Sequence, residues 1–267
     1  MMSIKSTMAC LAAMMLACAA SANAQGLPKP VPRVAPPSTL VILAHPDDEI
    51  IMAPVLNRLA RSDGEVTVVF ATSGDAGPGV SGLEPGDELA RLREDEARCS
   101  AFALRLPEPQ FWQLGDGTLA DTPRAADSPA KRLAGKISAI IAEMQPQVIM
   151  TWGPDGGYGH GDHRMVSNAV TQVVQTLDED RPDLLYSAIP NGRLPPMAEF
   201  ENWATTHPSM ITDRIEYDPP DLEAARNAIA CYESQFSPEA RAGLADLLHQ
   251  TIWRGRVFFR MAFVPDQ

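Results

Sequence analysis

Histidine and carboxylate side chains are concentrated in two short segments of this chain. The first is His45-Pro46-Asp47-Asp48-Glu49 and the second is His160-Gly161-Asp162-His163. They contain three of the five histidines in 267 residues. Imidazole nitrogens and carboxylate oxygens are the usual protein ligands of zinc in hydrolytic sites, where three of them leave one position open for water. The two segments therefore predict metal-assisted hydrolysis, provided that the fold brings them together.

Three side chains from these segments complete a ligand set for one ion: His45, Asp48 and His163. Two neutral imidazoles and one carboxylate leave zinc with a net positive charge, which acidifies water and polarises a carbonyl group. Ferrous iron is an alternative, because it accepts the same donors. Asp47 is not needed as a ligand, so its carboxylate is predicted to act as the general base that takes a proton from water.

Each segment also has an ordinary structural interpretation. Asp47 or Asp48 can cap the N-terminus of a helix, with Glu49 complementing the helix dipole in the first turn. An isolated pair with the spacing of His160 and His163 is more often plain surface or core than a metal site. The metal interpretation is favoured because both segments are predicted to follow strands of one sheet. Capping and metal binding are also compatible within one loop.

Strands and helices are predicted to alternate along the chain. Short apolar runs bounded by turn residues predict buried strands, and longer amphipathic stretches predict helices. The predicted strands are 40–44, 66–71, 111–114, 147–152 and 256–264, and the predicted helices are 49–61, 88–104, 129–144, 163–177 and 222–234. This alternation predicts an α/β fold, a Rossmann-like three-layer αβα sandwich with a mostly parallel central sheet. Ligands of such sheets bind beyond the carboxyl ends of the strands, where both segments stand.

The first 24 residues are predicted to be a signal peptide that is removed from the mature chain. Lys5 precedes an apolar run from residue 8 to residue 20, and Ala22-Asn23-Ala24 forms a cleavage site of small residues. Cleavage near Ala24 predicts export to the periplasm or the medium, without a membrane anchor. Lipidation of Cys18 is disfavoured, because the residues before it form a poor lipoprotein signal.

The rest of the chain is predicted to be one domain at 39–267, preceded by an extended, proline-rich lead-in at 25–38. The 34 acidic and 22 basic residues give a formal net charge of −12 and a sequence pI near 4.8. This excess of acid argues against nucleic acid and anionic membranes as partners. Cys99 and Cys231 remain after cleavage, and they form either one disulfide or two buried thiols. The oligomeric state is not predicted.

Several stretches of the chain are similar to a known family. Ala-His-Pro-Asp-Asp-Glu at 44–49 and Gly-Tyr-Gly-His-x-Asp-His at 157–163 resemble the PIG-L/LmbE-like N-acetylglucosaminyl deacetylases. Further similarity lies at 72–75, at Arg93-x-x-Glu96, at 116–117, from 153 to 163 and in Tyr-Glu-Ser-Gln at 232–235. Together these stretches span nearly the whole predicted mature chain. Many members of the family have His where this chain has Tyr232.

The resemblance implies a single LmbE-like deacetylase domain that removes an N-acetyl or N-acyl group from an amino sugar or glycoconjugate. The implied zinc ligands are His45, Asp48 and His163, and the implied general base is Asp47. His160 would stabilise the transition state or protonate the leaving amine, and Asp162 would orient and charge-tune His160. Tyr158 would help to hold the oxyanion. Amide hydrolysis needs an activated water, an electrophile and a proton for the amine, which this set supplies.

Two other functions fit the same residues. One is a zinc amidase acting on a non-sugar N-acyl substrate, and the other is a catalytically silent, metal-stabilised carbohydrate-binding protein. Asp47 argues against the silent protein, because binding alone needs no base. A dinucleotide site is disfavoured because the turn after the first strand lacks Gly-x-Gly-x-x-Gly, and a serine hydrolase because the Gly-x-Ser-x-Gly elbow is missing. Arg93 and Glu96 are interpreted as a solvated surface bridge, and residues 73–77 either line the pocket with backbone N–H groups or form ordinary turns.

Overall fold

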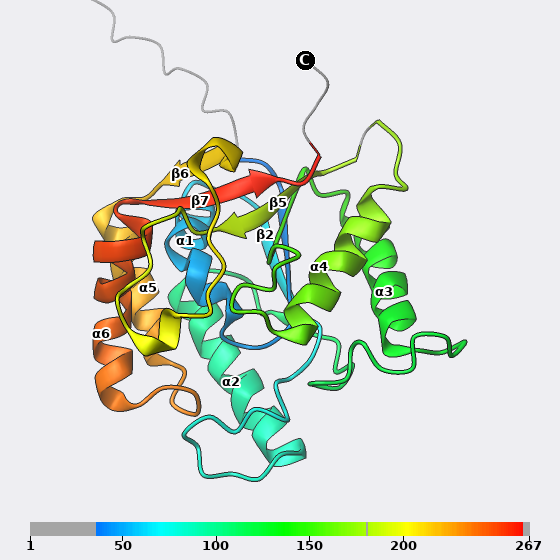
Figure 1. Ribbon diagram of the computed structural model, residues 1–267, viewed down its shortest axis with the longest axis horizontal. Coiled ribbons are helices and arrows are strands. Elements are labelled where there is room, and N and C mark those ends of the chain that lie inside the picture. Colours follow the sequence, from blue (N-terminus) through cyan, green and yellow to red (C-terminus); the bar gives the residue numbers. More distant parts are fainter. Residues whose placement is uncertain (1–35, 180, 264–267) are drawn as a thin grey trace, which may run out of the picture. The chain divides into compact units, whose positions relative to one another are not determined.

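A computed structural model describes residues 36–179 and 181–263 (Figure 1). The predicted signal peptide and most of the predicted lead-in lie outside these residues. Among the helices that the structure describes, none is both long and apolar enough to cross a membrane.

The described residues contain one seven-stranded sheet, in the order β3-β2-β1-β4-β5-β7-β6. Its strands are β1 (Thr39–Leu43), β2 (Val66–Phe70), β3 (Gln110–Phe111), β4 (Val148–Thr151), β5 (Asp183–Ala188), β6 (Asp213–Glu216) and β7 (Arg256–Met261). The strands β1 to β5 run parallel to one another, whereas β7 pairs antiparallel with both β5 and β6. The prediction of a mostly parallel α/β sheet is confirmed.

Helices cover both faces of this sheet. They are α1 (Ala53–Arg61), α2 (Asp87–Ala103), α3 (Pro129–Met144), α4 (Gly161–Val174), α5 (Pro219–Ala230) and α6 (Pro238–Leu248), with single turns η1 (Asp48–Met52), η2 (Ala198–Phe200), η3 (Pro208–Met210) and η4 (His249–Trp253). Side chains of β1 alternate between two cores: Leu40 and Ile42 pack with α3 and α4, whereas Val41 and Leu43 pack with α1, α2, α5 and α6. Figure 1 shows α3 and α4 side by side, apart from α5 and α6. The three-layer prediction is therefore confirmed.

Several predicted boundaries were wrong, and each has a local cause. The predicted helix 49–61 opens as the 3₁₀ turn η1, because an α-helix starting at residue 49 would need an N–H from Pro54 for the carbonyl oxygen of Ile50, and proline has none. The predicted strand 111–114 ends at Phe111, since Gln113 has a φ of +53° and breaks the extended chain. The strand β6 was not predicted because its edge position leaves alternate side chains exposed. In α6 only Ala245 and Leu248 are buried, so its apolar pattern is weak.

The chain direction across the sheet reverses between β1 and β4. From β1 the chain adds β2 and then β3 on one side, and from β4 it adds β5 on the other side. The loops that follow the carboxyl ends of β1 and β4 therefore lead to opposite sides of the sheet, and such a switch point is where open α/β sheets bind ligands. These are the two loops that contain the histidine and carboxylate segments.

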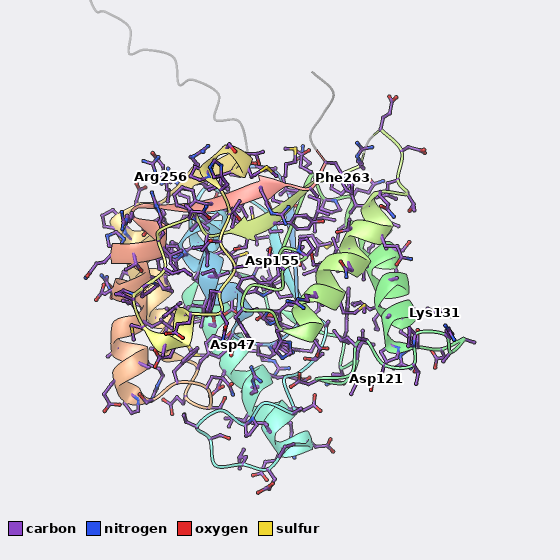
Figure 2. All side chains as sticks on the ribbon, viewed as in Figure 1. Asp47, Asp121, Lys131, Asp155, Arg256 and Phe263 are labelled. Atoms are coloured by element: carbon purple, nitrogen blue, oxygen red, sulfur yellow. A yellow bond between two sulfur atoms is a disulfide. The ribbon has the colours of Figure 1, made fainter. Side chains whose placement is uncertain are left out.

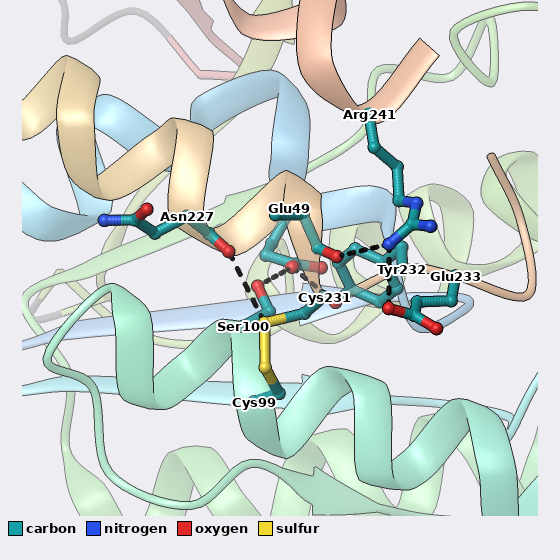
Figure 3. The surroundings of a disulfide bond; sticks show 9 residues. Glu49, Cys99, Ser100, Asn227, Cys231, Tyr232, Glu233 and Arg241 are labelled. Carbon is teal, nitrogen blue, oxygen red and sulfur yellow. Dashed lines mark hydrogen bonds and ion pairs between the residues drawn. A yellow bond between two sulfur atoms is a disulfide. The ribbon is translucent and has the colours of Figure 1, made fainter. Parts of the chain in front are cut away.

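A disulfide joins Cys99 in α2 to Cys231 at the end of α5 (Figure 3). The two cysteines are 132 residues apart in sequence, and their Cα atoms are 5.8 Å apart. The two alternatives left open by the sequence, a disulfide or two buried thiols, are decided in favour of the disulfide. Closing a loop of this length restricts the unfolded chain, which stabilises a fold by about 2–4 kcal/mol in typical cases.

Candidate functional site

The two segments meet at the carboxyl ends of β1 and β4, which are neighbouring strands. Asp47 and Asp155, one from each of the two loops, are labelled in Figure 2. His160 is the N-cap of α4, and its Nδ1 accepts the backbone N–H of Asp162 at 3.2 Å. His163 follows in the first turn of the same helix. The start of α4 thus presents both imidazoles to the end of β1.

The three residues predicted as metal ligands lie in contact. His45 Nδ1 is 3.2 Å from His163 Nε2, which is 2.9 Å from Asp48 Oδ1, and His45 Nδ1 is 3.8 Å from Asp48 Oδ2. Two donors that share one tetrahedral zinc ion are ~3.3 Å apart, given zinc–ligand bonds of about 2.0–2.2 Å. The two separations from His163 Nε2, 3.2 and 2.9 Å, are close to this value, whereas Asp48 faces His45 with its other oxygen, at 3.8 Å.

Bonds to the backbone orient these donors. His163 Nδ1 lies 3.1 Å from the carbonyl oxygen of Gly156, so a proton on Nδ1 leaves the Nε2 lone pair facing the other donors. Asp48 Oδ2 accepts the backbone N–H groups of Ala44 and His45 at 3.0 and 2.9 Å. Outer partners of this kind fix the rotamer and the protonation of metal ligands. The donor set is therefore held in place by the protein itself.

His45 turns its second nitrogen towards two carboxylates. His45 Nε2 is 2.9 Å from Asp116 Oδ1 and 3.4 Å from Asp162 Oδ2, an ion-pair approach without an aligned hydrogen bond. Burial alone lowers the pKa of His45, but Asp116, Asp162 and Asp48 together raise it to about 10. Asp116 was not among the predicted site residues. The only signal for it in the sequence was the family resemblance at 116–117.

Asp47 combines an unusual backbone conformation with a partly open side chain. Its φ is +101°, in a region that residues other than glycine seldom adopt, and its side chain is 21% exposed. Asp47 occupies the N-cap of η1 without a capping hydrogen bond from its side chain, so capping does not account for it. Burial raises the pKa of Asp47 to about 8, with Arg93 opposing and Asp48 adding to the rise.

The pKa of Asp48 is lowered, whereas that of its neighbour Asp47 is raised. Burial acts to raise the pKa of Asp48, but the charge and hydrogen bond of His163, together with His45, hold it well below its usual range. Adjacent carboxylates in one loop thus face different surroundings: Asp48 faces imidazoles, whereas Asp47 faces Arg93 and an open side. The two adjacent carboxylates therefore differ in their affinity for a proton.

Arg93 and Glu96 are buried, so their interpretation as a solvated surface bridge was wrong. Arg93 donates to the carbonyl oxygen of Pro46 at 2.7 Å and to Asp47 Oδ2 at 3.1 Å. Glu96 accepts hydrogen bonds from the backbone N–H and the hydroxyl of Ser234, each at 2.6 Å. The spacing within α2 could not reveal this, because the burial of a charged residue depends on what the helix packs against.

The backbone of the glycine-rich stretch 73–77 forms hydrogen bonds with Asp116 and Arg93. The N–H of Ala76 donates to Asp116 Oδ2 at 2.9 Å, and the carbonyl oxygen of Gly74 accepts from Arg93 at 2.8 Å. Gly74 has a φ of +68°, and a Cβ atom there would lie 2.3 Å from the Arg93 guanidinium, so only glycine fits. The stretch therefore positions Asp116 and Arg93.

His160 lies half buried beside the predicted ligands. Its ring centroid is 4.7 Å from that of His45 and 4.9 Å from that of His163. One donor nitrogen from each of the three imidazoles lies within 4.8 Å of the others. Burial, followed by the charges of His45 and His163, lowers the pKa of His160. Because Nδ1 serves the N-cap of α4, Nε2 is the nitrogen free to face a ligand.

The carboxylate of Asp162 accepts hydrogen bonds from the backbone of the loop at 117–119. Its Oδ2 accepts the N–H of Gly117 at 2.7 Å, and its Oδ1 accepts the N–H of Leu119 at 3.3 Å. The same carboxylate approaches His45, as described above. Asp162 still contacts His160, because its backbone N–H donates to His160 Nδ1 and its charge acts to raise the pKa of that imidazole, but its carboxylate approaches His45 instead. The reason is tertiary, because residues 117–119 come from the loop after β3.

Tyr158 lies at the open side of the site and is 43% exposed. Its ring centroid is 5.1 Å from that of His163 and 5.4 Å from that of Trp203. Partial burial, with Asp48 as the next cause, raises the pKa of Tyr158, so its hydroxyl keeps its proton. Trp203 was not predicted at the site, and it is brought there by a loop whose Ala204 N–H donates to the carbonyl oxygen of Gly157 at 2.7 Å.

The arrangement supplies the three groups that amide hydrolysis requires. A donor set of two imidazoles and a carboxylate is suited to a divalent ion. A second carboxylate, the partly exposed side chain of Asp47, follows His45 and precedes Asp48 in the same loop. The half-buried imidazole of His160 lies against the rings of His45 and His163. A proton acceptor and a proton donor flanking a cation site are the elements of metal-assisted acyl transfer to water.

Comparison with known proteins adds a family match and a curated relative. Residues 40–174 match the PIG-L family, described as GlcNAc-PI de-N-acetylase. Over 193 residues the chain is 30% identical to the 1D-myo-inositol 2-acetamido-2-deoxy-alpha-D-glucopyranoside deacetylase of Mycobacterium sp. (strain KMS), covering 65% of this chain and 62% of that protein. The chain thus spans less than two thirds of the length of this relative.

Solved structures with the same fold have different activities. The zinc inhibited form of teicoplanin deacetylase Orf2 has a TM-score of 0.62 and 19% identity, over 86% of this chain and 100% of that chain. GalB, the 4-carboxy-2-hydroxymuconate hydratase from Pseudomonas putida KT2440, has a TM-score of 0.60 and 14% identity, over 87% of this chain and 98% of that chain. These similarities show the fold alone, and the fold does not determine the reaction.

Proposed function

The chain belongs to the PIG-L family of GlcNAc-PI de-N-acetylases, and we propose that it is a metal-dependent hydrolase that removes an N-acetyl group from an amino sugar or glycoconjugate. The observation that carries the proposal is the convergence of His45, Asp48 and His163, with Asp47 beside them. The naming of the curated relative as a deacetylase of an acetamido sugar supports the substrate class.

The proposed ion is zinc, held by His45, Asp48 and His163. The chemistry of this donor set and the separations of 3.2 and 2.9 Å from His163 Nε2 to His45 Nδ1 and Asp48 Oδ1 support the assignment. When bound, a divalent ion polarises the acyl carbonyl and acidifies water. Ferrous iron fits the same donors and stays an alternative. The similar teicoplanin deacetylase is described in a zinc inhibited form, so both metals belong in the test.

The residues around the donor set have separate proposed roles. Asp47 accepts the proton of the attacking water, since its side chain is partly exposed and is not one of the three proposed metal ligands. His160 protonates the leaving amine through Nε2. Tyr158 donates its hydroxyl proton to the developing oxyanion from the open side. Asp162 supports His45 through its carboxylate and caps the loop at 117–119.

A screen for amine release tests this function. The purified chain is incubated with N-acetylglucosamine, its glycosides and N-acetylated amino acids, and free amine is measured. We expect release from one of the sugars, loss of release on chelation, and recovery when zinc or ferrous ion is added back. Release from acetylated amino acids alone would establish the non-sugar amidase instead. Sugar binding without any release would establish the silent binding protein.

Export is proposed for the same chain and is supported by the disulfide, because such bonds persist in oxidising compartments. The chain expressed in a bacterium is expected in the periplasm or the medium, with a mature N-terminus near Gln25. In that material Cys99 and Cys231 should resist alkylation until a reductant is added. Mass spectrometry measures both properties. A cytoplasmic chain with an intact Met1 and two alkylated thiols would contradict the proposal.

A further inference from the structure

Glu49, the last residue of the first segment, is 2% exposed and hydrogen-bonded on both carboxylate oxygens. Its Oε2 accepts the backbone N–H of Asp47 at 3.2 Å. Its Oε1 accepts the hydroxyl groups of Ser100 and Tyr232, each at 2.5 Å (Figure 3). The sequence suggested only a helix-dipole role for Glu49. Its carboxylate instead bridges the backbone of the proposed base to two distant elements.

The backbone at Asp47 needs such support. A non-glycine residue with a φ of +101° is strained, and this conformation persists only where surrounding contacts determine it. Two contacts hold this turn from outside it: Arg93 donates to the carbonyl oxygen of Pro46, and Glu49 accepts the N–H of Asp47. The direction in which the Asp47 carboxylate points therefore depends in part on where the Glu49 carboxylate is held.

The two hydroxyl groups that hold Glu49 are themselves fixed. Ser100 lies in α2 and Tyr232 just beyond α5, and both are buried. Their immediate neighbours in sequence, Cys99 and Cys231, form the disulfide (Figure 3). A covalent bond thus ties together the two elements that supply the donors. Tyr232 stands where many members of the resembling family have His, and here its hydroxyl provides the donor at that position.

We propose that Glu49, Ser100 and Tyr232, here called the Glu49 cluster, position the proposed base by holding the strained turn at Asp47. The expected effect on catalysis rests on the proposed function, in which Asp47 is the general base. The cluster residues are positioning residues rather than catalytic ones, since all three are buried behind the turn and act through Asp47. A purely structural role would lower stability, whereas a positioning role lowers kcat in a folded, metal-loaded protein.

The variant Tyr232→Phe separates these roles, because it removes one hydroxyl and leaves the ring in place. We expect kcat to fall by at least about ten-fold, as a small misplacement of a catalytic group can cost on the order of 100-fold. The KM and the bound metal should stay unchanged. Amide hydrogen exchange in the peptide spanning 45–52 should become faster. Tyr232→His keeps an N–H donor at this position, so it should recover most of the lost kcat.

The matched control is Tyr217→Phe. Tyr217 is also buried, and its hydroxyl bonds to His249 Nδ1 at 2.6 Å, outside both segments. This variant should keep the wild-type kcat and the wild-type exchange of the peptide 45–52. If Tyr232→Phe does not fold, Ser100→Ala provides the same test, because it removes the other hydroxyl with a smaller change in volume.

The outcomes separate the inference from the proposed function. Wild-type kcat and wild-type exchange of the peptide 45–52 in a folded Tyr232→Phe protein would overturn the Glu49 cluster while leaving the deacetylase intact. If the wild-type chain releases no amine from any sugar, the proposed function fails. The exchange measurement then decides alone whether the cluster holds the turn at Asp47.

Discussion

Replacing Asp47 with asparagine is expected to lower kcat for amine release by about 10²–10⁴-fold, the usual contribution of a positioned general base. The amide has nearly the volume of the carboxylate but does not accept a proton from water. Asparagine also tolerates the positive φ of Asp47 better than most residues, so the turn should survive. Steady-state kinetics on the substrate found by the screen, with metal analysis of the same sample, measures both properties.

The control for this variant is Asp121→Asn, which makes the same chemical change at an exposed loop position labelled in Figure 2. It should keep full activity. The metal content of Asp47→Asn should equal that of the wild type, because Asp47 is not in the proposed donor set. An unchanged kcat in Asp47→Asn would remove Asp47 from the role of base. Loss of metal would instead make it a ligand.

Replacing His163 with alanine is expected to remove the bound metal and, with it, the activity. His163 Nε2 lies within 3.2 Å of both other proposed donors, so its loss leaves only two of three ligands. The loss of an outer partner of a metal ligand already costs about 10–100-fold in affinity, and the loss of the ligand should cost more. Elemental analysis after gel filtration under anaerobic conditions measures the metal and also distinguishes zinc from iron.

Two further variants make this result specific. The ring of His163 is buried and stacks on Trp152, with centroids 5.1 Å apart, so alanine also opens a cavity. The variant His163→Gln fills more of that space, and it should still lose metal while melting closer to the wild type. His207→Ala changes an exposed histidine outside both segments and should keep metal and activity. Full metal occupancy in both His163 variants would refute the assignment.

Much of the fold followed from local patterns. The buried strands β1, β2 and β4 appear in the sequence as short apolar runs, because a strand covered on both faces needs apolar side chains at every position. The strand β6 did not appear, since an edge strand with one exposed face has no such run. The order of strands, with β1 beside β4, is a non-local property that no single run of residues encodes.

By itself the sequence determined which residues have the types that metal-assisted hydrolysis needs, since His45, Asp47, Asp48, His160 and His163 stand in two segments that follow predicted strands. Only the tertiary structure decided how these residues are held. It brought Asp116 and Asp162 to His45, buried Arg93 beneath Pro46 and Asp47, and linked Glu49 to Tyr232 across 183 residues. Residue type and spacing set the chemical capacity of a site. The partners of each side chain depend on packing between elements that are distant in sequence, and these partners control orientation and pKa.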